Sequence, residues 1–182
     1  MMSPIEHLVD VEVEAEDWLD LLPDAVAVVT TGVTAALNAG KVKSQADVVV
    51  LLCDDTEMKA LNKEYRQKNA PTNVLSFPAP QNPHINKAMQ IKGVLEHLGD
   101  IALGLETCVR EAKEQGKSLK NHVMHLSVHG ALHLLGYDHI ADDEAEAMES
   151  LERDILKTLG VDDPYAVPKD ITPKDRPKDQ HG

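Results

Sequence analysis

The segment HGALHLLGYDH contains three histidines, His129, His133 and His139, whose spacing is suited to binding a metal ion. Residues four positions apart on a helix lie on the same side, so His129 and His133 would both reach one ion. Gly136 can take the left-handed conformation that ends a helix, and the turn after it would return His139 to the pair. Three imidazole ligands and an open fourth position are typical of catalytic zinc. We therefore predict one zinc ion per chain at these histidines, and imidazole ligands would also suit nickel.

Two further histidines, His122 and His125, lie on the same side of the predicted helix, at three- and four-residue steps before His129. The alternative interpretation of the cluster is a set of buried histidines hydrogen-bonded to the backbone. This interpretation is the weaker of the two, because three histidines lie on the same side of the helix. For His125, support of a ligand and proton transfer are both open, so it is a candidate catalytic residue. His122 is expected to be a partly exposed polar residue outside the site.

Gly130 follows the first histidine of the predicted site, where zinc peptidases of the HExxH type carry the glutamate that acts as general base. Without that glutamate the peptidase mechanism lacks its base. The metal ion is therefore expected to serve other chemistry, unless another residue transfers the proton.

Four strands and five helices are expected to position these histidines. Alternating or continuously β-branched runs predict the strands, and apolar residues at helical spacing with cap and stop signals predict the helices. The strands are expected at residues 8–15, 46–53, 73–77 and 98–104, and the helices at residues 23–40, 54–65, 105–115, 118–135 and 143–159. The helix that carries the histidines is apolar or histidine on most faces, so we expect it in the centre of the fold.

The length and composition indicate a single domain. A chain of 182 residues, 42% of them hydrophobic, can bury one core, and its alternating helices and strands favour an α/β or α+β domain. We expect this domain to comprise residues 1–160. Residues 161–182 contain four prolines and little apolar content and are predicted to be a disordered tail. Residues 78–93, with three prolines, are predicted to be a long loop.

The net charge argues against some functions, and the N-terminal sequence indicates the cellular compartment. The net charge of −13 argues against a surface that coats nucleic acid broadly, because phosphate binding depends on Lys and Arg. A local basic cluster nevertheless occurs at Lys59, Lys63, Arg66 and Lys68. The acidic N-terminus is unlike a signal peptide, and no apolar run is long enough for a bilayer, so we expect a cytoplasmic protein with no membrane partner. Cys53 and Cys108 are expected to be buried, reduced thiols.

The histidine segment HGALHLLGYDH, preceded by HLSV, resembles the metal-binding motif of the bacterial YbeY family of endoribonucleases. The segment LNKEYRQKNAPTNVLSFP, residues 61–78, resembles the second signature of that family, and LGDIALG matches in position and type. The three segments cover nearly the whole predicted domain, from about residue 48 to residue 159. The proline-rich tail and the long loop depart from a typical member.

The resemblance implies an α+β fold in which a small mixed sheet of about four strands is flanked by about five helices. It implies zinc bound by His129, His133 and His139, and a functional arginine at Arg66, within the basic cluster. The implied substrate is single-stranded ribosomal RNA, processed at the 3′ end of the small-subunit rRNA and in ribosome quality control. Small-subunit ribosomal proteins and a ribosome-associated GTPase are the implied protein partners.

In the mechanism that follows from this resemblance, zinc lowers the pKa of a bound water or polarises a phosphoryl oxygen. Arg66 would stabilise the charge that develops on the phosphate. Asp138 is either a residue that orients a ligand histidine or an exposed turn residue. Thr72, Asn73 and Ser76 either line the cleft or have ordinary turn and strand roles.

Other functions stay open on the sequence alone. One is a metal-dependent hydrolase of another substrate class, of which a peptidase is disfavoured by Gly130. Another is a ribosome-associated binding protein that uses zinc structurally, which is favoured by the acidic charge and by the few aromatic side chains for stacking bases, one Phe and three Tyr. An RNA chaperone without cleavage ranks last.

Overall fold

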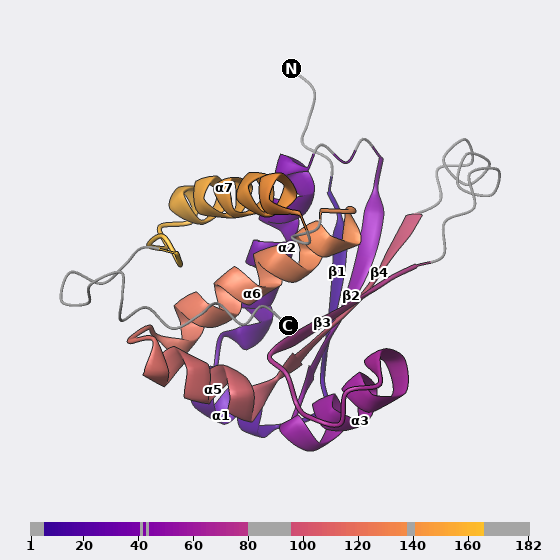
Figure 1. Ribbon diagram of the computed structural model, residues 1–182, viewed down its shortest axis with the longest axis vertical. Coiled ribbons are helices and arrows are strands. Elements are labelled where there is room, and N and C mark those ends of the chain that lie inside the picture. The colour runs from indigo at the N-terminus through magenta and orange to yellow at the C-terminus, as the bar shows by residue number, and fades with distance from the viewer. Residues whose placement is uncertain (1–5, 41, 43, 80–95, 138–140, 166–182) are drawn as a thin grey trace.

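The computed structural model of the chain is drawn in Figure 1 and describes residues 6–40, 42, 44–79, 96–137 and 141–165. This described part contains one mixed sheet of four strands, surrounded by six helices. The predicted α+β fold with a small mixed sheet is thus confirmed.

The sheet has the strand order β1-β2-β4-β3. β1 pairs with β2 and β2 pairs with β4 in parallel, whereas β3 runs antiparallel to β4. The strands are β1 (Leu8–Val13), β2 (Ala46–Cys53), β3 (Val74–Pro78) and β4 (Glu96–Gly104). β3 therefore forms one edge of the sheet. All four strands were predicted, with bounds that differ by two residues at most.

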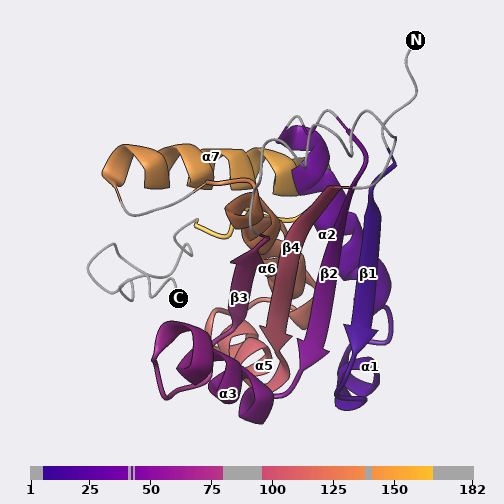
Figure 2. The same cartoon turned by 90° about the vertical axis from the view of Figure 1, so that its right-hand side faces the viewer.

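Six helices lie around the sheet in the same described ranges. They are α1 (Asp17–Leu21), α2 (Ala25–Ala39), α3 (Asp55–Arg66), α5 (Leu105–Glu114), α6 (Leu119–Leu134) and α7 (Asp142–Thr158). Five of them match predicted helices, and α1 was missed because five residues are too few to show a helical period. Figure 2 shows α2 and α6 behind one face of the sheet and α3 beyond the carboxyl ends of β2 and β4.

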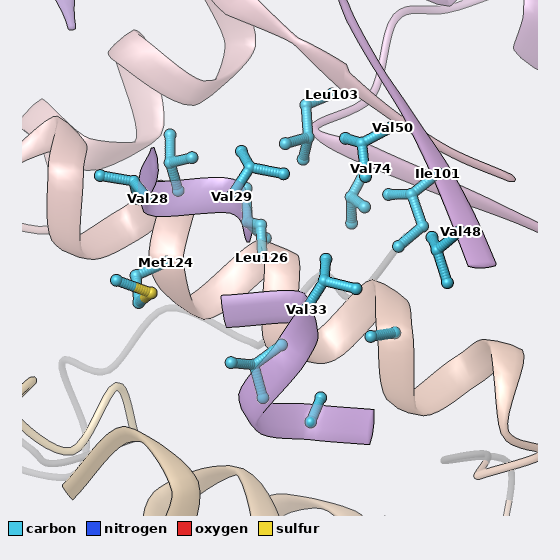
Figure 3. Close-up of a cluster of buried hydrophobic side chains, with 14 of the residues drawn as sticks. Val28, Val29, Val33, Val48, Val50, Val74, Ile101, Leu103, Met124 and Leu126 are labelled. Carbon is cyan, nitrogen blue, oxygen red and sulfur yellow. The ribbon is translucent and has the colours of Figure 1, made fainter. Parts of the chain in front are cut away.

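The histidine-bearing helix α6 is the central helix of the core, as predicted, and most of its residues are buried. Figure 3 shows its side chains Met124 beside Val28 and Leu126 beside Val29 and Val33 of α2, in the buried cluster that also contains Val48 and Val50 of β2. α2 and α6 can approach closely at Gly32 because this residue has no side chain. A Cβ atom there would lie only 3.0 Å from Cβ of Ser127. The helix is capped by Ser118, whose hydroxyl accepts a hydrogen bond from the backbone N–H of Asn121 at 3.1 Å.

The two faces of β3 are covered by different helices, because successive side chains of a strand point to opposite faces. The Ser76 hydroxyl donates to the carbonyl of Gly130 in α6 at 3.0 Å. Its neighbours Leu75 and Phe77 pack in a second cluster with Met58 of α3. At the β3 edge, α6 therefore covers one face of the sheet and α3 covers the other.

The structure confirms two local predictions, the helix cap at Asp54 and the buried thiols. α3 begins at the predicted cap, where Oδ1 of Asp54 accepts a hydrogen bond from the backbone N–H of Glu57 at 2.9 Å. Cys53 and Cys108 are buried free thiols, as expected, and burial raises the pKa of Cys53 to about 12.

The predicted domain boundary at residue 160 is followed by ordered contacts. Tyr165, within the predicted tail, is only 7% exposed and contacts side chains of α6 and α7. Residues 166–182 of that tail and residues 80–93 of the predicted loop lie outside the described residues. Across the residues that are described, no helix combines the length and the apolar character needed to span a membrane.

Candidate metal centre

The first two histidines of the predicted site lie next to each other on α6. Nε2 of His129 and Nε2 of His133 are 3.0 Å apart. Two nitrogen ligands of one tetrahedral zinc ion are about 3.3 Å apart, given metal–nitrogen distances of roughly 2.0–2.1 Å. The pair is therefore close to the spacing that a shared ion needs, and the predicted proximity is confirmed.

The end of α6 also has the predicted form. Gly136 has a φ of +95°, and its backbone N–H donates to the carbonyl of His133 at 3.0 Å. The N–H of Tyr137 donates to the carbonyl of Leu132 at 3.1 Å, so the chain turns back at the helix end. His139 and Asp138 lie outside the described residues.

A buried carboxylate that the sequence analysis missed, Glu152 of α7, faces the histidines. Its side chain is fully buried. Its Oε1 lies 2.5 Å from Nδ1 of His129, and its Oε2 lies 3.0 Å from Nε2 of His125. A signal for it exists in the sequence, because Glu152 falls four positions after Met148 and three before Ile155 on the apolar side of its helix.

The carboxylate determines which nitrogen of His129 carries the proton. Burial alone would raise the pKa of Glu152, but the hydrogen bonds from His125 and His129 hold that pKa well below its ordinary value. An ionised carboxylate only accepts hydrogen bonds, so Nδ1 of His129 is protonated and the lone pair is on Nε2, the nitrogen that faces His133. A carboxylate behind a histidine in this way is the usual support of a metal ligand.

His125 is a partner of Glu152 inside the protein. It is 8% exposed, and burial lowers its pKa, against the opposing effect of its hydrogen bond to Glu152. A neutral His125 still donates one N–H, which Glu152 accepts. These contacts suit the supporting role that the sequence left open more than direct proton exchange with a substrate.

A second arrangement could also bind an ion. One ligand atom from each of His125, His129 and Glu152 lies within 4.8 Å of the others, and all three residues are buried. A metal ion there would be bound by buried residues only, whereas the pair of His129 and His133 leads toward the half-buried end of α6. The two arrangements share His129 and differ in whether Glu152 acts as ligand or as support.

The expectation for His122 is wrong. His122 is 2% exposed, and its Nε2 lies 3.0 Å from Oε1 of Glu111. α5 packs against α6 and supplies this carboxylate, so the histidine is buried with a polar partner. Asn73 donates to the same Oε1 at 2.9 Å, and burial of Glu111, which would raise its pKa, is outweighed by these hydrogen bonds, which lower it.

The residues proposed to line a cleft have structural contacts. Asn73 binds Glu111, and Ser76 binds the backbone of α6 beside His129. Thr72 is half-buried next to them. For Asn73 and Ser76 these contacts favour the turn and strand roles over direct contact with a substrate.

Gly130 is fixed by packing against the sheet. A Cβ atom at this position would lie 3.1 Å from Cγ2 of Ile101, 3.3 Å from the Ser76 hydroxyl oxygen and 3.3 Å from Cγ2 of Val74. The side of α6 that would carry the peptidase glutamate is therefore closed. The absence of that base has a steric reason.

Arg66 is the last residue of α3 and is exposed, like the other members of the basic cluster. Gln67 ends the helix with a φ of +59°. The helix that ends at Arg66 packs at the β3 edge on the face of the sheet opposite to the histidine-bearing α6. The structure does not bring Arg66 into contact with the described histidines.

Comparisons with known proteins agree with the motifs. The model of the family described as Endoribonuclease YbeY matches residues 12–160. A protein named Endoribonuclease YbeY from Rhizorhabdus wittichii is 50% identical over 172 residues, which cover 90% of this chain and 100% of that protein. Proteins of the same name from Chelativorans sp. and Azorhizobium caulinodans are 50% and 45% identical, over 87% and 88% of this chain and 93% and 97% of their own lengths.

Proposed function

The chain belongs to the YbeY family of endoribonucleases, and from this premise we propose that it is a metal-dependent endoribonuclease that cleaves single-stranded ribosomal RNA. Its proposed role is maturation of the 3′ end of small-subunit rRNA and ribosome quality control, in the cytoplasm. Small-subunit ribosomal proteins and a ribosome-associated GTPase are its proposed protein partners. The observation that carries the proposal is the pair of His129 and His133, backed by the buried Glu152, within the family's region of match.

The proposed metal ligands are His129, His133 and His139, with one zinc ion per chain. Neutral imidazole nitrogens suit zinc, and nickel would fit the same ligands. A bound ion of this kind supplies Lewis-acid activation of a phosphoryl oxygen or a more acidic water. Glu152 holds the proton on Nδ1 of His129, so that Nε2 is available as the ligand atom.

Arg66 is proposed to bind the phosphate. A guanidinium group can donate two parallel hydrogen bonds to a phosphate and stabilise the charge that develops there. Since α3 and α6 pack on opposite faces of the sheet at the β3 edge, we propose that the RNA strand reaches Arg66 and the histidines by passing over that edge. A flexible single strand can follow such a path more easily than a stiff duplex. His125 is proposed to support Glu152 and His129 within the catalytic site.

A second candidate function is a ribosome-associated binding protein with a structural metal ion. The group of His125, His129 and Glu152 favours this candidate, because all three residues are buried and an ion bound there would be out of reach of an RNA phosphate. A peptidase is disfavoured by the steric closure at Gly130.

The two candidates are separated by one cleavage experiment. Purified protein with stoichiometric zinc is incubated with a single-stranded RNA that carries the 3′ end of small-subunit rRNA, with the same RNA annealed to its complement, and with casein. We expect cleavage of the single strand alone, loss of cleavage on chelation, and recovery on adding zinc back. A zinc-loaded protein that binds the RNA without cutting it would favour the binding protein instead.

A further inference from the structure

Tyr165 is buried against the Glu152 carboxylate, although it belongs to a segment whose composition predicts disorder. Its hydroxyl donates to Oε2 of Glu152 at 2.5 Å and lies 3.4 Å from Nε2 of His125. Its ring meets the His125 ring edge to face, with centroids 5.5 Å apart. The chain therefore returns after α7 to contact the group that supports His129.

Tyr165 also contacts Arg153 of α7 and Asp163. The Arg153 guanidinium lies 5.3 Å from the centre of the Tyr165 ring, within the range of a cation–π contact. Oδ1 of Asp163 accepts from Nε of Arg153 at 3.2 Å and from the backbone N–H of Tyr165 at 2.8 Å. These contacts hold Tyr165 in position through both its backbone N–H and its ring.

The two carboxylate oxygens of Glu152 accept hydrogen bonds from different residues. Oε1 accepts from His129, whereas Oε2 accepts from both His125 and Tyr165. If the carboxylate rotated about its last bond, the hydrogen bond to His129 would lose its alignment. A phenol held by a rigid ring on Oε2 opposes that rotation, so it keeps Oε1 directed at Nδ1 of His129.

We propose that Tyr165 is a positioning residue of the metal site. Its hydroxyl fixes the Glu152 carboxylate, and the carboxylate fixes the tautomer and the ring orientation of His129. This inference rests on the proposed function in one respect, namely that His129 binds the ion through Nε2. It assigns the end of the described chain a role in metal affinity, which a disordered tail would not have.

The direct test is the Tyr165→Phe variant, which removes only the hydroxyl and keeps the ring contacts. Zinc affinity is measured by competition with a chromophoric chelator. We expect affinity to fall by up to about 10-fold, the lower end of the range for loss of a group bonded directly to a metal ligand, because Tyr165 acts through Glu152. The zinc-free variant should still unfold cooperatively, with a melting temperature several degrees below that of the wild type, because a buried hydrogen bond to a charged group is lost. The matched control is Tyr65→Phe, since Tyr65 is 61% exposed and should keep wild-type affinity. A zinc affinity of Tyr165→Phe within twofold of the wild type would overturn the inference.

A second measurement shows whether Tyr165 acts through Glu152. When Glu152→Gln is already present, adding Tyr165→Phe should leave zinc affinity unchanged, because the carboxylate that Tyr165 positions is no longer there. A full additional loss in that background would overturn the inference. Cleavage is measured separately: a wild type that binds zinc and cuts no RNA contradicts the proposed nuclease but leaves this test intact, and a wild type without zinc contradicts both.

Discussion

His129 and Glu152 are 23 positions apart in the sequence, yet Nδ1 of His129 lies 2.5 Å from Oε1 of Glu152 in the contact between α6 and α7. The carboxylate is fully buried and also accepts from His125. The geometry leaves Nε2 of His129 as the nitrogen directed at His133. A histidine pair of ordinary helical spacing thereby acquires the tautomer that a metal ligand requires.

Replacement of Glu152 by Gln should weaken zinc binding. An amide keeps the shape of the side chain but has one oxygen acceptor, so it cannot hold the N–H groups of both histidines as the carboxylate does. We expect zinc affinity to fall about 10–100-fold, measured by chelator competition. Glu146→Gln, an exposed change on the same helix, is the control and should bind zinc like the wild type. Equal affinity of the Glu152 variant would show that the carboxylate does not support the ligand.

Replacement of Arg66 by Ala should slow RNA cleavage without removing the metal. Loss of a group that stabilises developing charge costs about 10²–10³ in kcat. Rates on single-stranded RNA are compared at equal zinc occupancy, with Arg110→Ala, another exposed arginine, as the control. An unchanged rate for the Arg66 variant would remove this residue from the mechanism.

Replacement of Gly130 by Ala should destabilise the protein. The added methyl group would meet Ile101, Ser76 and Val74 at 3.1–3.3 Å, and overpacking of this kind costs about 1–3 kcal/mol. The better helix propensity of Ala returns about 1 kcal/mol, so we expect a net loss of about 1 kcal/mol in the free energy of unfolding. Urea denaturation measures it. A variant more stable than the wild type would mean that α6 can move away from the sheet freely.

The lowered pKa of Glu111 should make stability depend on pH. The folded-state pKa of Glu111 is lowered, so the native protein holds its proton less tightly than the unfolded chain does. The resulting stabilisation is present above the ordinary carboxyl pKa and is lost as the pH falls through the lowered value. Glu111→Gln should therefore be less stable than the wild type by about 1 kcal/mol at pH 7, the size of a hydrogen bond.

The same Glu111 comparison at lower pH provides its check. Urea denaturation at pH 4 should show a smaller difference between Glu111→Gln and the wild type than at pH 7. Glu114→Gln, an exposed change on the same helix, should show little difference at either pH. A difference for Glu111→Gln that is constant between the two values would contradict the assigned pKa direction.

The local part of this site was predictable, because it depends on residues a few positions apart. The spacing of His129 and His133 on one helix gives their proximity directly, and Gly136 gives the turn that follows. The strands and the longer helices were predictable for the same reason. α1 was not, since five residues carry no period.

The rest of the site depends on how distant elements pack. Glu152 comes from another helix, although its place on an apolar side was a usable signal. His122 is buried only because α5 covers it with Glu111. Tyr165 stands among prolines and acids, whose composition favours disorder, and its order comes from specific contacts with Arg153, Asp163 and Glu152.

The most direct measurement is the zinc content of two single variants, His133→Ala and His125→Ala, determined by elemental analysis after dialysis against a fixed low concentration of free zinc. An ion held by His129, His133 and His139 predicts that His133→Ala loses its stoichiometric zinc, while His125→Ala retains most of it. Zinc retained in full by His133→Ala and lost by His125→Ala would place the ion in the buried group with Glu152 and contradict the proposed ligands.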